Sequence, residues 1–300
     1  MLEEVAMPAQ SPVGPAASPR AGTAGAFSPQ TGLLVVGHGT ANPAGAAETA
    51  AVAAMIGTAS PTTPVELGYL EVIEPSIDKA VERLAARGCR EIVALPILLF
   101  AAGHAKRDVP TALAEAGSRW GLSVRQASPL GLQPQLISLA QRRFLQAVAA
   151  VPPYAAEEEM ILVVGRGSSD PTAAHQLRAF GNAVYDSVER AQGRQRSIGF
   201  VAAAQPTLKD AIEAAASPAT GSPVPKRVVV HPHLLFPGHV ETQVTGHLQR
   251  AQQLWPAIEW VQVGRLGPAS GVVQALIARG LELVKPKENR VVADEAGASA

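Results

Sequence analysis

The chain has 300 residues, of which 47% are hydrophobic and 17% charged, and its 25 basic and 25 acidic residues give a formal net charge of zero. This apolar composition excludes an intrinsically disordered protein, and the balanced charge argues against a surface for nucleic acid or anionic membranes. The length allows two domains, and a single cysteine, Cys89, cannot form an internal disulfide, which fits a reducing compartment.

The two ends of the chain and one central segment lack the pattern of a folded core. Residues 1–30 are rich in Ala, Pro, Ser and Gly and predict a disordered tail, and residues 286–300 predict a second tail. Residues 151–159, with two prolines and three consecutive glutamates, are interpreted as a linker. The longest apolar run, Ile92 to Ala102, is shorter than the roughly 18 residues of a membrane-spanning helix, so we expect a cytoplasmic protein.

Between these segments, apolar runs typical of strands alternate with stretches of helical periodicity. In the first half we expect strands at Leu33–Gly37, Val65–Leu70, Glu91–Leu98 and Leu122–Gln126, and helices at Ala44–Ile56, Pro75–Arg87, Asp108–Gly117 and Pro134–Ala149. The strands are apolar throughout rather than alternating. The pattern therefore predicts an α/β fold in which helices cover both faces of a mostly parallel four-stranded sheet.

The second half of the chain repeats the first. The matching segments are LLVVGHGTANP from Leu33 with ILVVGRGSSDP from Ile161, LGYLEVIEP from Leu67 with IGFVAAAQP from Ile198, and IVALPILLFAAGH from Ile92 with VVVHPHLLFPGH from Val228. This repeat predicts two homologous domains, residues 31–150 and 160–285, that face each other across a cleft with a ligand between them.

Three polar residues follow the expected strands of the first unit. His38 lies just past the first strand, Glu71 just past the second, and His104 in the loop after the third. Ligands of such sheets bind beyond the carboxyl ends of the strands, where two imidazoles and a carboxylate could converge on a divalent metal ion. Each residue also has a simpler interpretation. His38 could complete a strand-to-helix turn, and the other two could be solvated surface residues.

The motifs taken together resemble a known family. They are VGHGT ending at Thr40, YLEVIEP at Tyr69–Pro75, LPILLFAAGHAKRDVP at Leu95–Pro110, and VGRGSSDP at Val164–Pro171. With these motifs the chain resembles the class II tetrapyrrole chelatases that act on sirohydrochlorin, of the CbiX and SirB type, in their long two-repeat form. The resemblance extends over roughly residues 32–285.

The resemblance implies that a divalent metal ion, Co²⁺ or Fe²⁺, is inserted into sirohydrochlorin with release of two protons, for cobalamin or sirohaem biosynthesis. It implies that His38 and His104 bind the metal and assist proton removal, and that Glu71 is the carboxylate of the same site. No cofactor is implied beyond the substrate metal, and imidazole and carboxylate ligands also suit Ni²⁺.

The second unit departs from this pattern. Arg166 stands opposite His38 and Ala202 opposite Glu71, and a guanidinium group is neither a metal ligand nor a base at neutral pH. We therefore expect one metal-insertion site, in the first unit. Arg166 is a candidate partner for a substrate carboxylate, or else it binds carbonyl groups of a neighbouring loop. Lys106 and Arg107 are further candidates for substrate binding, although a solvated helix start explains them equally well.

Three histidines of the second unit form a possible accessory metal site. His231 and His233 are two residues apart and would share one face of a strand, and His239 is nearby. Histidines on such an apolar run are more often packed or hydrogen-bonded residues, so both interpretations stay open.

Two other functions compete with the chelatase hypothesis. A phosphoryl-transfer enzyme with His38 as nucleophile would need a neighbouring arginine to hold phosphate, but residue 37 is glycine. A non-catalytic carrier of metal or tetrapyrrole would use the same residues without turnover. Because one chain contains both halves, we expect a monomer whose partners are sirohydrochlorin and a divalent metal ion.

Overall fold

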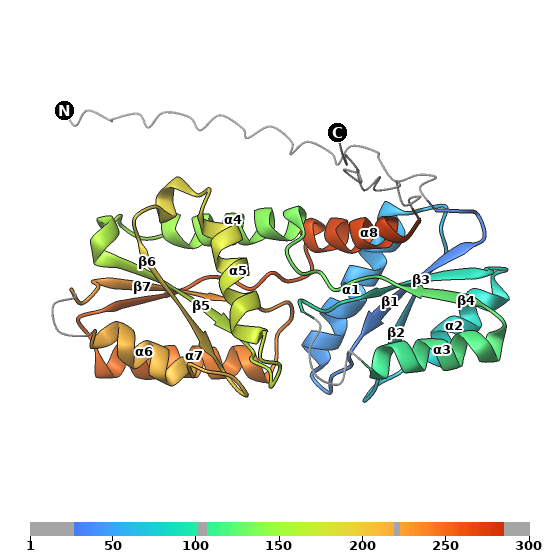
Figure 1. Ribbon diagram of the computed structural model, residues 1–300, viewed down its shortest axis with the longest axis horizontal. Coiled ribbons are helices and arrows are strands. Elements are labelled where there is room, and N and C mark those ends of the chain that lie inside the picture. The colour runs from blue at the N-terminus through green and yellow to red at the C-terminus, as the bar shows by residue number, and fades with distance from the viewer. Residues whose placement is uncertain (1–26, 101–106, 219–222, 285–300) are drawn as a thin grey trace, which may run out of the picture.

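The computed structural model describes residues 27–100, 107–218 and 223–284, which form two sheets flanked by helices (Figure 1). All strand pairs are parallel, and the strand orders are β2-β1-β3-β4 and β6-β5-β7-β8. The predicted α/β fold with two four-stranded sheets is confirmed. In chain order the elements are β1 (Thr31–Gly37), α1 (Pro43–Ala59), β2 (Val65–Tyr69), α2 (Ile77–Ala86), β3 (Glu91–Pro96), α3 (Asp108–Trp120), β4 (Ser123–Gln126), α4 (Pro134–Ala149), η2 (Ala156–Glu158), β5 (Glu159–Gly165), α5 (Ala173–Tyr185), η3 (Glu189–Ala191), β6 (Gln195–Phe200), α6 (Leu208–Ala216), β7 (Arg227–Pro232), α7 (His239–Leu254), β8 (Glu259–Gln262) and α8 (Ser270–Val284).

The central strands are buried along their whole length. Every residue of β1 and of β5 is buried, because helices cover both faces of each sheet. Local signals define the helices between them. Asn42 accepts hydrogen bonds from two backbone amides at the start of α1, with Pro43 as the first helical residue, and α3 ends at Gly121, whose φ is 68°. None of the described helices is both long and apolar enough to cross a lipid bilayer.

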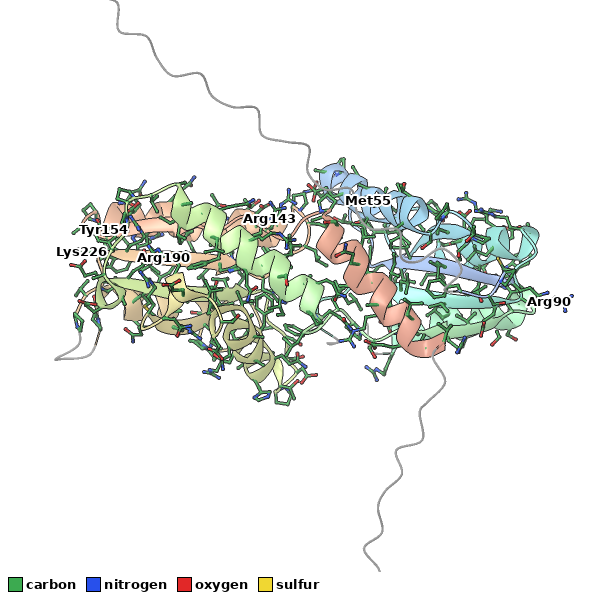
Figure 2. All side chains as sticks on the ribbon, turned by 90° about the horizontal axis from the view of Figure 1, so that it is seen from above. Met55, Arg90, Arg143, Tyr154, Arg190 and Lys226 are labelled. Atoms are coloured by element: carbon green, nitrogen blue, oxygen red, sulfur yellow. The ribbon has the colours of Figure 1, made fainter. Side chains whose placement is uncertain are left out.

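The last helix of each unit packs on the other unit. Helix α8 lies against β3 and α1 of the first sheet, and α4 lies against α5 and β8 of the second. In Figure 2, seen from above, the green α4 covers the second sheet and the red α8 covers the first. The two repeats predicted at residues 31–150 and 160–285 therefore do not pack as separate bodies, because the sheet of each is covered by a helix from the other.

Close contacts hold the exchanged helices in place. On the first sheet, Arg125 donates to the carbonyl of Leu283 at 2.6 Å, and a side chain at Gly280 would come within 2.9 Å of a methyl group of Leu95. On the second, the rings of Phe144 and Tyr185 meet edge to face at 5.0 Å. One apolar cluster is therefore continuous through both domains under α1, α4, α5 and α8, while the opposite faces of the two sheets have separate clusters.

Phe27 corrects the predicted N-terminal tail. This residue was expected to belong to a disordered segment ending at residue 30, but it is only 6% exposed and is part of the continuous apolar cluster. The remainder of that tail, residues 1–26, and the predicted tail at 286–300 lie outside the described residues.

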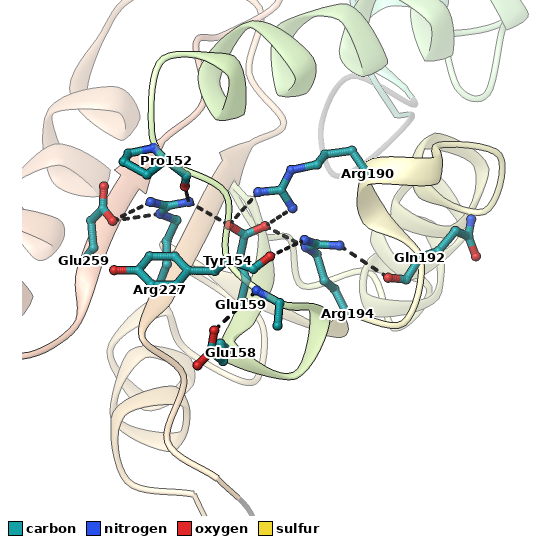
Figure 3. Close-up of polar contacts among 10 residues, drawn as sticks. Pro152, Tyr154, Glu158, Glu159, Arg190, Gln192, Arg194, Arg227 and Glu259 are labelled. Atoms are coloured by element: carbon teal, nitrogen blue, oxygen red, sulfur yellow. Dashed lines mark hydrogen bonds and ion pairs between the residues drawn. The ribbon is translucent and has the colours of Figure 1, made fainter.

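A buried ion cluster fastens the predicted linker to the second sheet. Glu159, expected as the last linker residue, is the first residue of β5. Its carboxylate accepts hydrogen bonds from Arg190, Arg194 and Arg227 at 2.7 to 3.1 Å (Figure 3). Arg227 also donates to the carbonyl of Pro152 at 2.7 Å. The cluster therefore lies at the amino ends of the strands, away from the edge where a ligand would bind.

Candidate functional site

His38 and Glu71 lie together at the carboxyl edge of the first sheet. Strands β1 and β2 are neighbours, with Gly37 paired to Tyr69, so the residues just past both strands are adjacent. His38 Nε2 lies 3.3 Å from Glu71 Oε1, and the side chains are 50% and 58% exposed. A neutral imidazole and a carboxylate, both open to solvent, can bind a divalent cation or accept protons.

The backbone fixes the two loops against each other. The amide of Leu70 donates to the carbonyl of Gly37 at 3.0 Å, and the amide of Glu71 donates to the carbonyl of His38 at 3.1 Å. Between them, Gly39 has a φ of 100°, and a Cβ atom there would lie 1.9 Å from the Glu71 carbonyl oxygen. Only glycine fits this position, so the GHG sequence is required by the loop that carries the histidine.

We expect Gly39→Ala to lower the free energy of unfolding by roughly 2 kcal/mol or more, because the new methyl group meets a backbone carbonyl at a positive φ. Urea denaturation measures the change. Gly57→Ala is the matched control, since Gly57 lies in α1 with open space around it, and alanine there favours the helix. Equal stability of the two variants would contradict the requirement for glycine at residue 39.

An apolar hollow borders the pair. Its lining is Val36, Gly37, His38, Leu70, Pro96, Leu98 and Val109. The polar pair thus has an apolar wall on one side, contributed by the ends of β1, β2 and β3 and by the start of α3. A ligand at the pair would therefore have apolar protein surface beside it.

The structure accounts for only part of the predicted metal set. His104 and Lys106 lie in residues 101–106, outside the described residues. Arg107 is exposed immediately before α3, and its carbonyl accepts from the amide of Thr111. Within the three described ranges, no group of three or more His, Cys, Asp and Glu side chains could hold a metal. The described part of the site is therefore the His38–Glu71 pair.

The second unit keeps the loops but not the ligands. The amides of Val201 and Ala202 donate to the carbonyls of Gly165 and Arg166 at 3.1 and 2.9 Å, which reproduces the hydrogen bonds of the first unit. Gly167 has a φ of 93°, and a Cβ atom there would lie 1.6 Å from the carbonyl oxygen of Ala202. Arg166 is exposed, and its side chain has no ion-pair or hydrogen-bond partner among the residues described.

The predicted accessory metal site is not assembled. His231 lies in β7 and is buried, with its Nδ1 hydrogen-bonded to the hydroxyl of Tyr185. His233 is also buried, with its ring 3.8 Å from that of Phe180, whereas His239 is exposed at the first position of α7. The expectation that the first two share a face was sound, but that face belongs to the core. The described structure therefore does not bring His231, His233 and His239 together around a metal, and the aligned counterparts of His231 and His233, Leu95 and Ile97, are apolar core residues.

Burial keeps both histidines neutral. It lowers the pKa of His231 to about 4 and that of His233 to about 3, the latter with a contribution from His231. An unfolded histidine has a pKa near 6.5, so the unfolded chain binds protons first as the pH falls. The contribution of the pair to stability is complete above about pH 6.5 and is lost between that pH and about 4.

We therefore expect acidification from pH 7 to pH 5 to cost roughly 2 kcal/mol of unfolding free energy for each of the two histidines. The variant Tyr185→Phe, His231→Leu, His233→Ile should have a flatter pH profile in chemical denaturation. The two histidines are replaced by their apolar counterparts from the first unit, and Tyr185 loses the hydroxyl that bonds to His231. His239→Gln, at an exposed position, should retain the wild-type slope. Parallel profiles for all three proteins would contradict this assignment.

An ion pair between the units was not anticipated from the sequence. Arg265, in the loop after β8, binds the carboxylate of Glu48 on α1 through two hydrogen bonds of 2.5 and 2.8 Å, and it binds Glu241 on α7 at 3.0 Å. Nearby, Gly45 of α1 leaves room for the carbonyl of Pro237. These contacts join the carboxyl edge of the second sheet to the helix that follows His38. None of the sequence motifs indicated this ion pair.

The chain matches one protein family twice. The family model described as CbiX matches residues 32–147 and residues 160–283. Among curated proteins, the chain is 26% identical over 226 residues to the sirohydrochlorin ferrochelatase of Priestia megaterium, covering 75% of this chain and 80% of that protein. It is 25% identical over 236 residues to the sirohydrochlorin cobaltochelatase of the same organism, covering 78% and 74%.

Solved structures show the same fold. SirB from Bacillus subtilis with Fe³⁺ has a TM-score of 0.70 at 24% identity, covering 83% of this chain and 94% of that one. CbiX, described as the terminal enzyme for biosynthesis of siroheme in denitrifying bacteria, has a TM-score of 0.59 at 21% identity, covering 85% and 100%. Both likenesses cover the two sheets together rather than one unit alone.

Proposed function

Because this chain belongs to the CbiX family, we propose that it is a sirohydrochlorin chelatase that inserts a divalent metal ion, Co²⁺ or Fe²⁺, into sirohydrochlorin. The observation that carries the proposal is the solvent-open pair of His38 and Glu71, with 3.3 Å between imidazole and carboxylate, beside an apolar hollow. Relatives named for ferrochelatase and cobaltochelatase activity support the reaction class.

Metal insertion requires groups that bind the metal ion transiently and groups that accept two protons. Two pyrrole N–H bonds break as the four nitrogens of the macrocycle bind the metal ion, so the metal ion enters and two protons leave. His38 and Glu71 are both able to accept a proton, and both are weak enough ligands to release the metal to the macrocycle. We propose His104 as the third ligand of this set, and no cofactor beyond the substrate metal.

In this proposal the second unit binds the substrate but supplies no reactive residue. Its loop has the same backbone hydrogen bonds as the first, but Arg166 and Ala202 replace the reactive residues. The exposed guanidinium of Arg166 is suited to a bidentate contact with a carboxylate at the rim of the substrate. Lys106 and Arg107 are proposed as further carboxylate contacts from the first unit. One chain supplies both halves, so a monomer is sufficient.

Anaerobic insertion of Fe²⁺ and Co²⁺ into sirohydrochlorin, followed by the visible spectrum of the tetrapyrrole, tests the proposal. We expect turnover well above the spontaneous rate with at least one metal, and the ratio of the two rates selects between a sirohaem and a cobalamin role. Binding of tetrapyrrole or metal without turnover would instead identify a carrier.

A further inference from the structure

Val72, the residue after Glu71, is in a conformation that branched residues avoid. Its φ is 72°, and the amide of Ile73 donates to the carbonyl of Glu71 at 2.9 Å across it. A hydrogen bond spanning one residue of positive φ is the classic γ-turn, which is rare and strained. For a β-branched side chain such a φ is an outlier that requires an explanation.

Packing within the described protein does not explain it. The residue is 65% exposed, so the valine contributes little to the core in return for the strained backbone. A glycine or asparagine would adopt the same backbone at lower cost. Strained residues cluster at ligand clamps and active sites, and this one adjoins a residue of the reactive pair.

Comparison of the two units shows that the backbone bend at Val72 does not depend on the valine side chain. Ala203 occupies the aligned position in the second unit, is exposed, and also has a positive φ of 52°. The backbone bend therefore belongs to the fold of both units. The branched apolar side chain occurs where the carboxylate of Glu71 is present, whereas the second unit has Ala202 and Ala203.

The surroundings show what the side chain could contact. The carbonyl of Glu71 lies against Gly39, and its amide is bonded to His38, so the backbone next to Val72 is held relative to the reactive pair. The hollow beside His38 is apolar, with Leu70 and Leu98 in its wall. A macrocycle over this pair would offer its flat apolar face to both surfaces.

We propose that Val72 is a substrate-contacting residue that packs against the face of the tetrapyrrole ring and positions it over His38 and Glu71. This inference rests on the proposed function and adds a specificity residue to it. The strained turn presents the isopropyl group to the substrate while the adjoining Glu71 carboxylate remains directed at His38.

The test is the affinity for metal-free sirohydrochlorin, measured by quenching of its fluorescence, for wild type, Val72→Gly and Val72→Asn. Both replacements tolerate the positive φ and preserve the bend, but the first removes the side chain and the second makes it polar. We expect the dissociation constant to rise about fivefold or more in both variants. In steady-state assays KM should rise with little change in kcat, and the affinity for Co²⁺ alone should not change.

Ala203→Gly is the matched control, because it makes a similar change at the aligned bend of the second unit, and it should bind like wild type. Wild-type affinity and KM in Val72→Gly would overturn the inference while leaving the chelatase proposal intact. Failure of the wild-type protein to bind sirohydrochlorin would reject both. Binding without turnover would reject catalysis, while the affinities of the Val72 variants would still decide the inference.

Discussion

Alanine in place of His38 is expected to lower the rate of metal insertion into sirohydrochlorin by roughly 10²- to 10⁴-fold. The imidazole can accept a pyrrole proton, and it lies 3.3 Å from Glu71, which can also accept one. The side chain is half exposed, so its removal should leave the unfolding temperature close to that of wild type. Anaerobic single-turnover spectra with Co²⁺ and Fe²⁺ measure the rate.

The control for this variant is His239→Ala, which removes an exposed histidine at the start of α7 in the second unit. It should retain wild-type turnover. Substantial activity in His38→Ala, or an equal loss in the control, would contradict a single reactive site in the first unit. Glu71→Gln tests the carboxylate as a whole, since the amide keeps the shape but can neither accept the proton nor supply the charge.

Glu159→Ala is expected to produce the largest loss of stability, about 3 to 5 kcal/mol in urea denaturation. The carboxylate is fully buried, and its removal leaves the guanidinium groups of Arg190, Arg194 and Arg227 without their shared partner. Burial acts to raise the pKa of Glu159, but hydrogen bonds from the three arginines outweigh it and hold the pKa below its ordinary value. The stabilisation is therefore present above the unfolded carboxyl pKa and is lost as the pH falls below it.

Glu158→Gln provides the comparison one residue away. Glu158 pairs with Lys226 at the surface, where solvent screens the interaction, so this variant should unfold like wild type. Similar stability of the two variants would mean that the buried cluster contributes nothing beyond an ordinary surface pair.

The sequence was sufficient to predict the sheets and the meeting of His38 with Glu71. Strands buried on both faces are apolar throughout, and residues just past neighbouring parallel strands share an edge. The repeat also predicted that Arg166 would occupy the loop equivalent to that of His38. These predictions depend on local pattern and on rules of parallel sheets, which leave few alternatives.

The sequence could not predict which surfaces pack against each other. The apolar stripe of α4 indicates that one face is buried, but not which sheet buries it. For His231 and His233, alternation along the strand predicted a shared face without saying that the face was the core. The aligned residues Leu95 and Ile97 carried that information. Phe27, a single aromatic in a stretch of small residues, gave no periodic signal at all.

Because α4 and α8 each pack on the sheet of the other unit, the boundary between the two repeats in the sequence does not separate two independent parts of the molecule. A fragment ending at residue 150 would keep α4 without the second sheet and would expose the side of β3 that α8 covers. A proteolytic nick between α4 and β5 would therefore leave two pieces that remain interlocked, each completing the core of the other. In this chain we therefore expect the pair of repeats to fold, and to tolerate truncation, only as one unit.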